Sequence, residues 1–182
     1  MLEKTHRRKK QQIAHRGIGF SPLSKRSIFC TVGVCLLLVA YVLAVELVSH
    51  RTSRLIRERN LFAAKQCNSV LRSISLSEKN SLLYEARIHR LEGDFDAFNN
   101  TVKRILEAGG EEGQVQFEQT LGMAQQGYLD GVEDTIVGLL TRSDVDQFEV
   151  CDAYVNGLLA SGRTGTAETV IDAWKKDHAN WV

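Results

Sequence analysis

Glu85 and His89 are four residues apart, a spacing at which an acid and an imidazole could exchange a proton. Residues at this spacing share one face of a helix, where such a pair is usually an exposed surface pair. The sequence contains no HExxH, P-loop, GxSxG or GxGxxG motif, and His50 and His178 have no second ligand at metal-binding spacing. We therefore predict that the chain is not an enzyme and that it has no catalytic residue, metal site or cofactor.

The four cysteines do not follow a pattern typical of zinc or redox chemistry. Cys30 and Cys35 lie in an apolar run, and Cys67 and Cys151 are isolated, with neither a CxxC motif nor a nearby pair of histidines. Cys67 and Cys151 are expected to be small buried side chains. Their spacing gives no reason to expect a disulfide framework.

The apolar run extends from Ile28 to Val45, with Thr31 as its clearly polar residue. Continued through Val48, the run measures about 30 Å as a helix, enough to cross a bilayer. We predict a transmembrane helix over 27–49. The alternative is a cleaved signal peptide that ends at Val42-Leu-Ala44, but both the leader before the run and the run itself are longer than is usual for such peptides.

Residues 1–26 precede the run as a basic arm, which we expect to be disordered and cytoplasmic. Eight Lys and Arg residues stand against one acid, Glu3, for a local charge of +7. Such an arm is retained on the cytoplasmic side, although four arginines between 51 and 59 follow the other end of the run. We therefore predict a single-pass protein of the cell (inner) membrane, with its C-terminal domain on the extracytoplasmic or periplasmic side.

The charge of the remaining chain changes with distance from the run. Residues 51–72 carry +5 and residues 73–182 carry −10, so basic side chains flank the run on both sides. Anionic headgroups attract such residues by about 1 kcal/mol each, and we expect lipid contacts through the span and its flanks. The arm would also suit nucleic acid, but no aromatic residue precedes Phe20, and the acidic distal part argues against that ligand.

A short phrase recurs three times after the run, beginning at Gly93, Gly127 and Gly162. The spacings are 34 and 35 residues, a period typical of stacked helical hairpins that bind other proteins. Apolar residues recur at helical spacing, and proline occurs once, at Pro22. The sequence therefore predicts an all-α protein, with an N-terminal transmembrane helix followed by a short α-solenoid of about three helix-turn-helix repeats.

The expected boundaries follow from the apolar stripes and the capping residues. Residues 50–75 are predicted to form a juxtamembrane stalk or half-repeat helix, and 76–182 to hold repeats at about 76–110, 113–143 and 146–179. Ser75-Leu-Ser-Glu78 is typical of a capping box, Asp94 can cap the helix after Gly93, and the segment 143–146 can cap the third repeat. The second helix of the second repeat is expected over 129–141.

The 34-residue period, the helix-turn-helix unit and the turn glycine resemble those of tetratricopeptide repeats. With Gly93 as the turn glycine, Ala86 falls on the small position of the first helix and Phe95 on the first aromatic position of the second. The sequence departs from the family where the small position of the second helix holds Phe98 and Val132, and where the closing proline is missing. The resemblance is to degenerate members and covers about two-thirds of the chain.

The resemblance implies that the first helices line a concave groove. The partner-binding residues that it places there are Asn80, Leu83, Arg87, Arg90, Gln114, Phe117, Leu121, Gln125, Asp152 and Asn156. The groove would be basic at one end and acidic at the other, while the alternative interpretation leaves Arg87 and Arg90 as solvated surface residues. The Lys and Asn set with which some family members hold a C-terminal carboxylate is absent.

These observations predict a membrane-anchored helical-repeat scaffold or adaptor that binds protein partners at the membrane surface. The alternatives are a cytoplasmic-facing adaptor and a cleaved, secreted peptide-binding module of the same repeat class. Because the last repeat has no evident polar cap, we also expect the chain to form a homo-oligomer through its C-terminal repeat.

Overall fold

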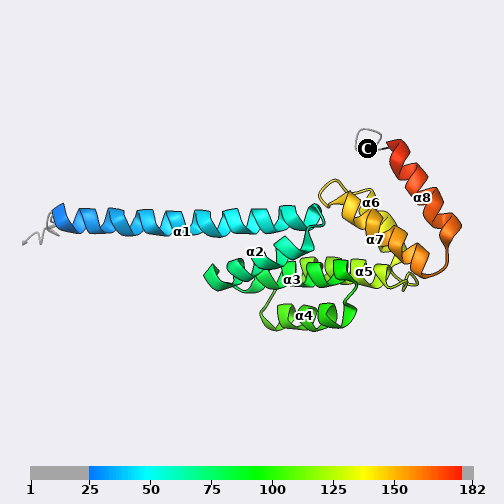
Figure 1. The fold of residues 1–182 in the computed structure, drawn as a ribbon, viewed down its shortest axis with the longest axis horizontal. Coiled ribbons are helices and arrows are strands. Elements are labelled where there is room, and N and C mark those ends of the chain that lie inside the picture. The colour runs from blue at the N-terminus through cyan, green and yellow to red at the C-terminus, as the bar shows by residue number, and fades with distance from the viewer. Residues whose placement is uncertain (1–24, 178–182) are drawn as a thin grey trace, which may run out of the picture. The chain divides into compact units, whose positions relative to one another are not determined.

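The computed structural model describes residues 25–177, and within this range the chain forms eight helices and no strand (Figure 1). The helices are α1 (Lys25–Arg57), α2 (Leu61–Ile74), α3 (Lys79–Glu92), α4 (Phe95–Glu107), α5 (Glu112–Gln125), α6 (Glu133–Leu140), α7 (Gln147–Ala160) and α8 (Thr164–Asp177). The all-α prediction is confirmed for this part of the chain. The basic arm up to residue 24, and His178, lie outside the described residues.

The chain divides into two compact units, one up to Tyr41 and one from Val42 onward. Within residues 25–177, α1 is the one helix that is long and apolar enough to cross a membrane. Its stretch from Phe29 has a mean hydropathy of 2.5, and the rest of the chain buries none of its most apolar part. Because exposed apolar surface costs about 25 cal/mol per Å² in water, an apolar environment would stabilise this stretch. A membrane anchor and a signal sequence both have these properties.

The chain beyond the apolar stretch differs from the single helix expected over 50–75. α1 continues to Arg57 and is followed by a turn in which Arg59 is left-handed, with φ of 59°. Asn60 then caps α2, because its side chain accepts a hydrogen bond from the backbone N–H of Ala63 at 3.2 Å. The segment therefore consists of the end of α1 and a separate helix, which reverses the chain direction (Figure 1).

Glycine ends the first helix of each predicted hairpin, as expected. Gly93, Gly127 and Gly162 have φ of 76°, 83° and 76°, the left-handed region in which a Cβ is unfavourable. Gly131 adds a further left-handed turn, with φ of 90°. As a result α6 begins at Glu133, and its eight residues make it shorter than the helix expected over 129–141.

The predicted N-terminal caps have mixed outcomes. The capping box at Ser75 is wrong, because its hydroxyl accepts from the N–H of Ser77 at 3.2 Å and α3 starts after Glu78 without a side-chain cap. The cap expected for the third hairpin is confirmed at Asp146, whose carboxylate accepts from the N–H of Glu149 at 3.3 Å. The cap at residue 94 is likewise confirmed for α4.

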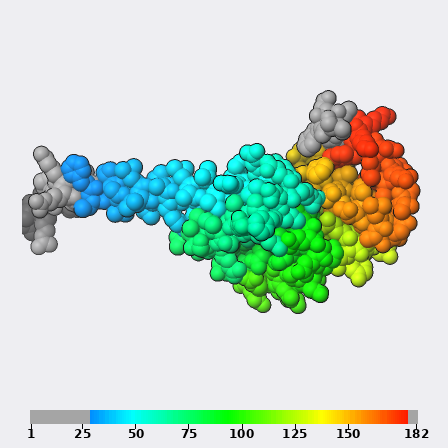
Figure 2. Space-filling model, in the orientation of Figure 1, coloured from blue at the N-terminus to red at the C-terminus, as the bar shows by residue number. Residues whose placement is uncertain are grey.

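The helices of the second unit pack in chain order. α3 packs against α4 and α5, and α5 packs against α6 and α7, so the helices α3, α5 and α7 are neighbours. In Figure 2 the colours pass from green through yellow to orange along the surface, and the cyan part of the chain borders both the green and the yellow parts. Two apolar clusters form most of the core, one that includes Ile105 and Val115 and one that includes Ile136 and Leu158.

Two glycines 35 residues apart permit close packing between neighbouring helices. A Cβ on Gly157 would lie 2.1 Å from the backbone oxygen of Ala124, and a Cβ on Gly122 would lie 2.6 Å from the ring of Phe98. Phe98 is bulky for the small position that the resemblance assigns to it, and the missing side chain at Gly122 makes room for its ring. Val132, the other departure, precedes α6 and is not a helical residue.

Candidate functional site

An open cavity of about 830 Å³ lies along α3 and α5, and we call it the groove. Leu83 of α3 and Phe117 of α5 are half-buried apolar side chains on its walls, and Gln114 is an exposed polar one. The turn between α6 and α7 closes one side with Arg142 and Asp144, which form an ion pair. The groove thus combines apolar contact area with polar groups at its edge, a composition typical of sites that bind other molecules.

The inner wall of the groove holds a network of two arginines from α3 and two glutamates from α5 and α7. Glu118 accepts hydrogen bonds from Arg87 Nε at 2.8 Å and from Arg90 Nε at 2.9 Å. Glu149 pairs with Arg90 and lies 3.4 Å from Arg87 Nε. Arg90 Nη1 also donates to Gln125 Oε1 at 3.1 Å. The network therefore ties α3 to the two following first helices.

Burial makes these charges depend on one another. Arg90 and Glu118 are each only 1% exposed, so neither charge has water to stabilise it. Burial by itself would raise the pKa of Glu118, but Arg90 and Arg87 outweigh it and hold that pKa below its ordinary value. Burial raises the pKa of Glu149 despite the two arginines, with Glu118 adding repulsion. Burial acts to lower the pKa of Arg87, but the attraction of Glu118 and Glu149 is stronger and raises that pKa above its ordinary value.

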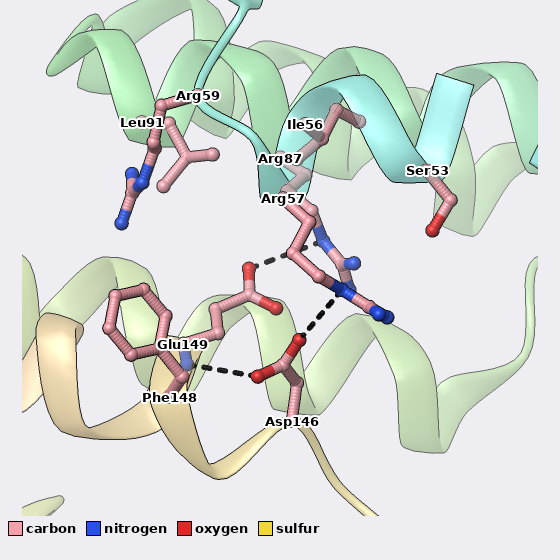
Figure 3. Close-up of a pocket in the computed structure, with 9 residues that line it drawn as sticks. All are labelled: Ser53, Ile56, Arg57, Arg59, Arg87, Leu91, Asp146, Phe148 and Glu149. Atoms are coloured by element: carbon pink, nitrogen blue, oxygen red, sulfur yellow. Dashed lines mark hydrogen bonds and ion pairs between the residues drawn. The ribbon is translucent and has the colours of Figure 1, made fainter. Parts of the chain in front are cut away.

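The end of α1 covers part of the same surface (Figure 3). Ser53, Ile56 and Arg57 from α1 face Asp146 and Glu149 at the start of α7 around a small pocket of about 30 Å³. Arg57 Nε lies 3.4 Å from the Asp146 carboxylate, and Ile56 is 4% exposed. The last turns of α1 are therefore part of the folded unit.

The predicted partner-binding residues fall into three groups in the structure. Leu83, Gln114 and Phe117 line the open part of the groove, and Asn80 is exposed at the neighbouring end of α3. The internally bonded ones are Arg87, Arg90, Gln125 and Asp152, the last through Arg59. Leu121 is completely buried, and Asn156 is exposed on α7 but does not line the groove.

Arg87 and Arg90 do not give the groove the basic end that the resemblance implies. Arg87 and Arg90 carry the same amount of charge as their two glutamate partners, so the network is neutral as a whole. The interpretation of both arginines as solvated surface residues is also wrong, since the side chain of Arg90 has no exposed area and that of Arg87 is 22% exposed. Arg87 lines the groove, whereas Arg90 is buried and does not line it.

Glu118, Tyr84 and Asp146 belong to the site but are missing from the set predicted by sequence. Tyr84 Oη lies 2.9 Å from the Ser49 hydroxyl of α1, which helps to hold α1 against α3. A signal for Glu118 is present in the sequence, because it lies within the apolar stripe between Val115 and Leu121. A charge at such a position has to find a buried partner.

Glu85 and His89, whose spacing would allow an exchange of a proton, do not pair with each other. The carboxylate of Glu85 lies 3.3 Å from Arg104 and 3.6 Å from Arg72, while His89 is nearest to Glu92, with Nδ1 3.9 Å from its carboxylate. Among the described residues, no group of three His, Cys, Asp or Glu side chains gathers in a way that could hold a metal ion.

Comparison with protein-family models, with curated proteins and with solved structures finds no match to this chain.

Proposed function

We propose that this protein is a membrane-anchored helical-repeat scaffold or adaptor, which binds a protein partner in the groove. One observation carries the proposal. The helix that contains the exposed apolar stretch runs without a break into the unit that forms the groove, where Ile56 is buried. In this arrangement α1 contains the proposed anchor and, through Ser53, contributes to the lining of the groove.

Several features support a repeat of the tetratricopeptide class. The left-handed turns at Gly93, Gly127 and Gly162 recur at 34 and 35 residues, and each follows the first helix of a pair. The helices α3, α5 and α7 are neighbours, as the first helices are in such repeats. Repeats of this kind bind other proteins on the face that their first helices line.

The groove favours a basic segment that carries an apolar side chain. Glu118, Glu149 and Asp144 are paired with arginines, but Glu111 also lines the groove and forms no ion pair within residues 25–177. Leu83 and Phe117 supply apolar area beside it. An aliphatic or aromatic anchor flanked by Lys or Arg would match both features, since complementary charge steers association and apolar contact retains the partner.

Cross-linking from the groove tests the proposal. A photoactivatable amino acid at Phe117 of the full chain in native membranes is expected to capture a discrete partner, and one at Asn100, exposed on α4, is the matched control. Capture from Phe117 alone supports the groove as the binding surface. Equal capture from both positions, or none from Phe117, contradicts it.

For the location, we propose a single-pass protein of the cell (inner) membrane, with the basic arm in the cytoplasm and the helical unit on the other side. An Asn100→Cys variant reports the side, because a membrane-impermeant thiol reagent would modify it in intact cells. Cys151 is a poor reporter, since it is buried and burial raises its pKa to about 11. Modification only after permeabilisation would favour the cytoplasmic-facing alternative.

The secreted alternative is tested by the N-terminal sequence of the protein isolated from cells. Cleavage after Ala44 would leave Ser49, Thr52 and Ile56 in place, so a cleaved form would keep its contacts with α3. A mature chain that starts near residue 45 would overturn the anchor but not the groove.

Self-association through the C-terminal repeat stays a prediction. Ala167 is the fully buried residue of α8 within residues 164–177, and Val170 and Ile171 are half-buried. Sedimentation of the detergent-solubilised full chain tests the prediction, and a monomer across the whole concentration range would refute it.

A further inference from the structure

We infer that Asp146 and Asp152, which we call the acidic face of α7, bind two basic side chains of the partner. In the free protein this face is occupied by Arg57 and Arg59 of the same chain, which the partner displaces. The inference rests on the proposed function, because it concerns how the groove recognises a basic segment. All of these residues belong to the unit from Val42 onward.

Two ion pairs join the end of α1 and the turn after it to α7. Arg57 Nε lies 3.4 Å from the carboxylate of Asp146, and Arg59 pairs with Asp152, which follows it by 93 residues in the chain. The apolar residue Ile56 directly precedes these arginines. The chain therefore supplies to its own acidic face the combination of basic and apolar side chains that the groove is proposed to bind.

Both ion pairs are partly exposed, which makes them easy to exchange. The side chain of Arg57 is 72% exposed and that of Arg59 is 40% exposed, so water competes with the carboxylates. Arg59 also has a left-handed φ of 59°, which is unfavourable for a residue with a Cβ. Ile56, in contrast, is buried in one cluster with Ile88 of α3. The two arginine side chains can therefore leave α7 while α1 stays packed on α3.

The Arg57–Asp146 pair lies where two cavities meet. The residues that line both the small pocket and the groove are Ser53, Arg87, Asp146 and Glu149. Figure 3 shows the Arg57 side chain reaching from α1 to Asp146, with Phe148 to one side of it. Phe148 is exposed and Leu91, which also lines the small pocket, is half-buried. Without this pair the small pocket would open into the groove and offer these two side chains to an apolar residue of the partner.

The internal segment also determines which partners can bind. A tethered segment has an effective concentration of about millimolar, so a partner with a single basic residue would replace only one of the two pairs. A partner with two basic residues beside an aliphatic or aromatic side chain would replace both and gain the apolar contact. The recognised segment therefore has the same pattern as residues 56–59 of this chain.

A fluorescein-labelled peptide with the sequence of residues 51–60 is the probe, titrated with the full chain in phosphatidylcholine nanodiscs. The opened variant combines Arg57→Gln with Arg59→Gly, since glycine is the usual residue at a left-handed helix end. Because two exposed ion pairs are lost, we expect the peptide to bind the opened variant about tenfold more tightly than the parent protein. Arg57→Gln alone should give an intermediate affinity. Equal binding to the parent protein and to both variants would overturn the inference.

Replacement of the acids tests whether the peptide binds the acidic face. Asp146→Asn and Asp152→Asn are added together to the opened variant, and asparagine at 146 keeps the N-terminal cap of α7. Asp96→Asn with Glu107→Gln removes the same charge from exposed positions on α4 and is the matched control. We expect the first pair of changes to abolish the gain in affinity and the second to leave it. A gain that persists without the two α7 carboxylates would contradict the inference.

Cross-linking from Phe117 separates this inference from the proposed function. Capture of a partner there, together with equal peptide binding by the parent protein and the opened variant, would remove the inference and leave the proposed function intact. The expected gain in peptide affinity without capture from Phe117 would support the acidic face as a peptide site and contradict the proposed function.

Discussion

Replacing Arg90 with Met should destabilise the helical unit strongly, although it changes no residue of its apolar core. Arg90 has no exposed side-chain area and lies 2.9 Å from Glu118, which is itself 1% exposed. The replacement leaves Glu118 with one arginine, Arg87, in a site that water does not reach. Removal of one partner from a buried pair costs about 3–5 kcal/mol, and because Arg87 stays beside Glu118 we expect a loss of about 3 kcal/mol.

A double replacement separates the ion pair from simple packing. Arg90→Met with Glu118→Met removes both buried charges and leaves Arg87 beside Glu149. Because apolar side chains of similar volume replace a buried pair with little loss, we expect the double variant to lie within about 1 kcal/mol of the parent protein. Arg104→Met is the surface control, since its pair with Glu85 is partly exposed and is worth at most about 1 kcal/mol.

Thermal unfolding of the full chain in nanodiscs, followed by far-ultraviolet circular dichroism, measures these three variants and the Glu118→Met single variant. A loss of about 3 kcal/mol corresponds to a fall in Tm of about 10 °C for a unit of this size. The argument is refuted if Arg90→Met costs no more than Arg104→Met. It is also refuted if the cost of the double variant equals the sum of the two single costs, because the charges would then act independently.

Further predictions concern the same network and the helix contacts. Glu118→Gln should lower the free energy of unfolding at neutral pH, and this loss should vanish in acid. The pKa of Glu118 is lower in the folded than in the unfolded protein. Its carboxylate therefore contributes stability above its ordinary pKa, and this contribution is lost as the pH falls through the folded pKa. Denaturant titrations at several pH values would show this convergence, and a constant deficit would contradict it. Gly157→Ala should cost about 3 kcal/mol, because its Cβ would overlap the oxygen of Ala124 at 2.1 Å. Gly138→Ala, in α6 with no atom within 4 Å of the new Cβ, should stabilise by about 0.5–1 kcal/mol in the same unfolding assay.

The sequence could predict the helix ends that depend only on residues close to them in the chain. A glycine directly after an apolar stripe ends a helix by its own backbone preference, and Gly93, Gly127 and Gly162 do so here. Asp94 and Asp146 cap helices because their carboxylates reach backbone N–H groups three residues on. These outcomes depend on local chemistry, so a single sequence contains them.

The groove wall could not be predicted in the same way, because it depends on which helices meet. Arg90 and Glu118 are 28 residues apart, and their pairing follows from the packing of α3 on α5. The resemblance placed Arg90 on the binding face, where the network now shows it bonded internally. Phe98 similarly counts as a misfit until Gly122 is placed against its ring. Whether a residue fits its packing position depends on the facing residue of the partner helix as much as on its own size.

The last turns of α1 join the proposed anchor to the proposed binding surface without a flexible linker. From Glu46 to Arg57 the helix advances about 16 Å, and Ile56 and Arg57 at its end face the groove wall. A flexible linker of eleven residues would let its ends separate by about 18 Å in any direction. In the proposed function the groove belongs to a unit that follows the proposed span directly in the chain, which favours partners that are themselves close to the membrane.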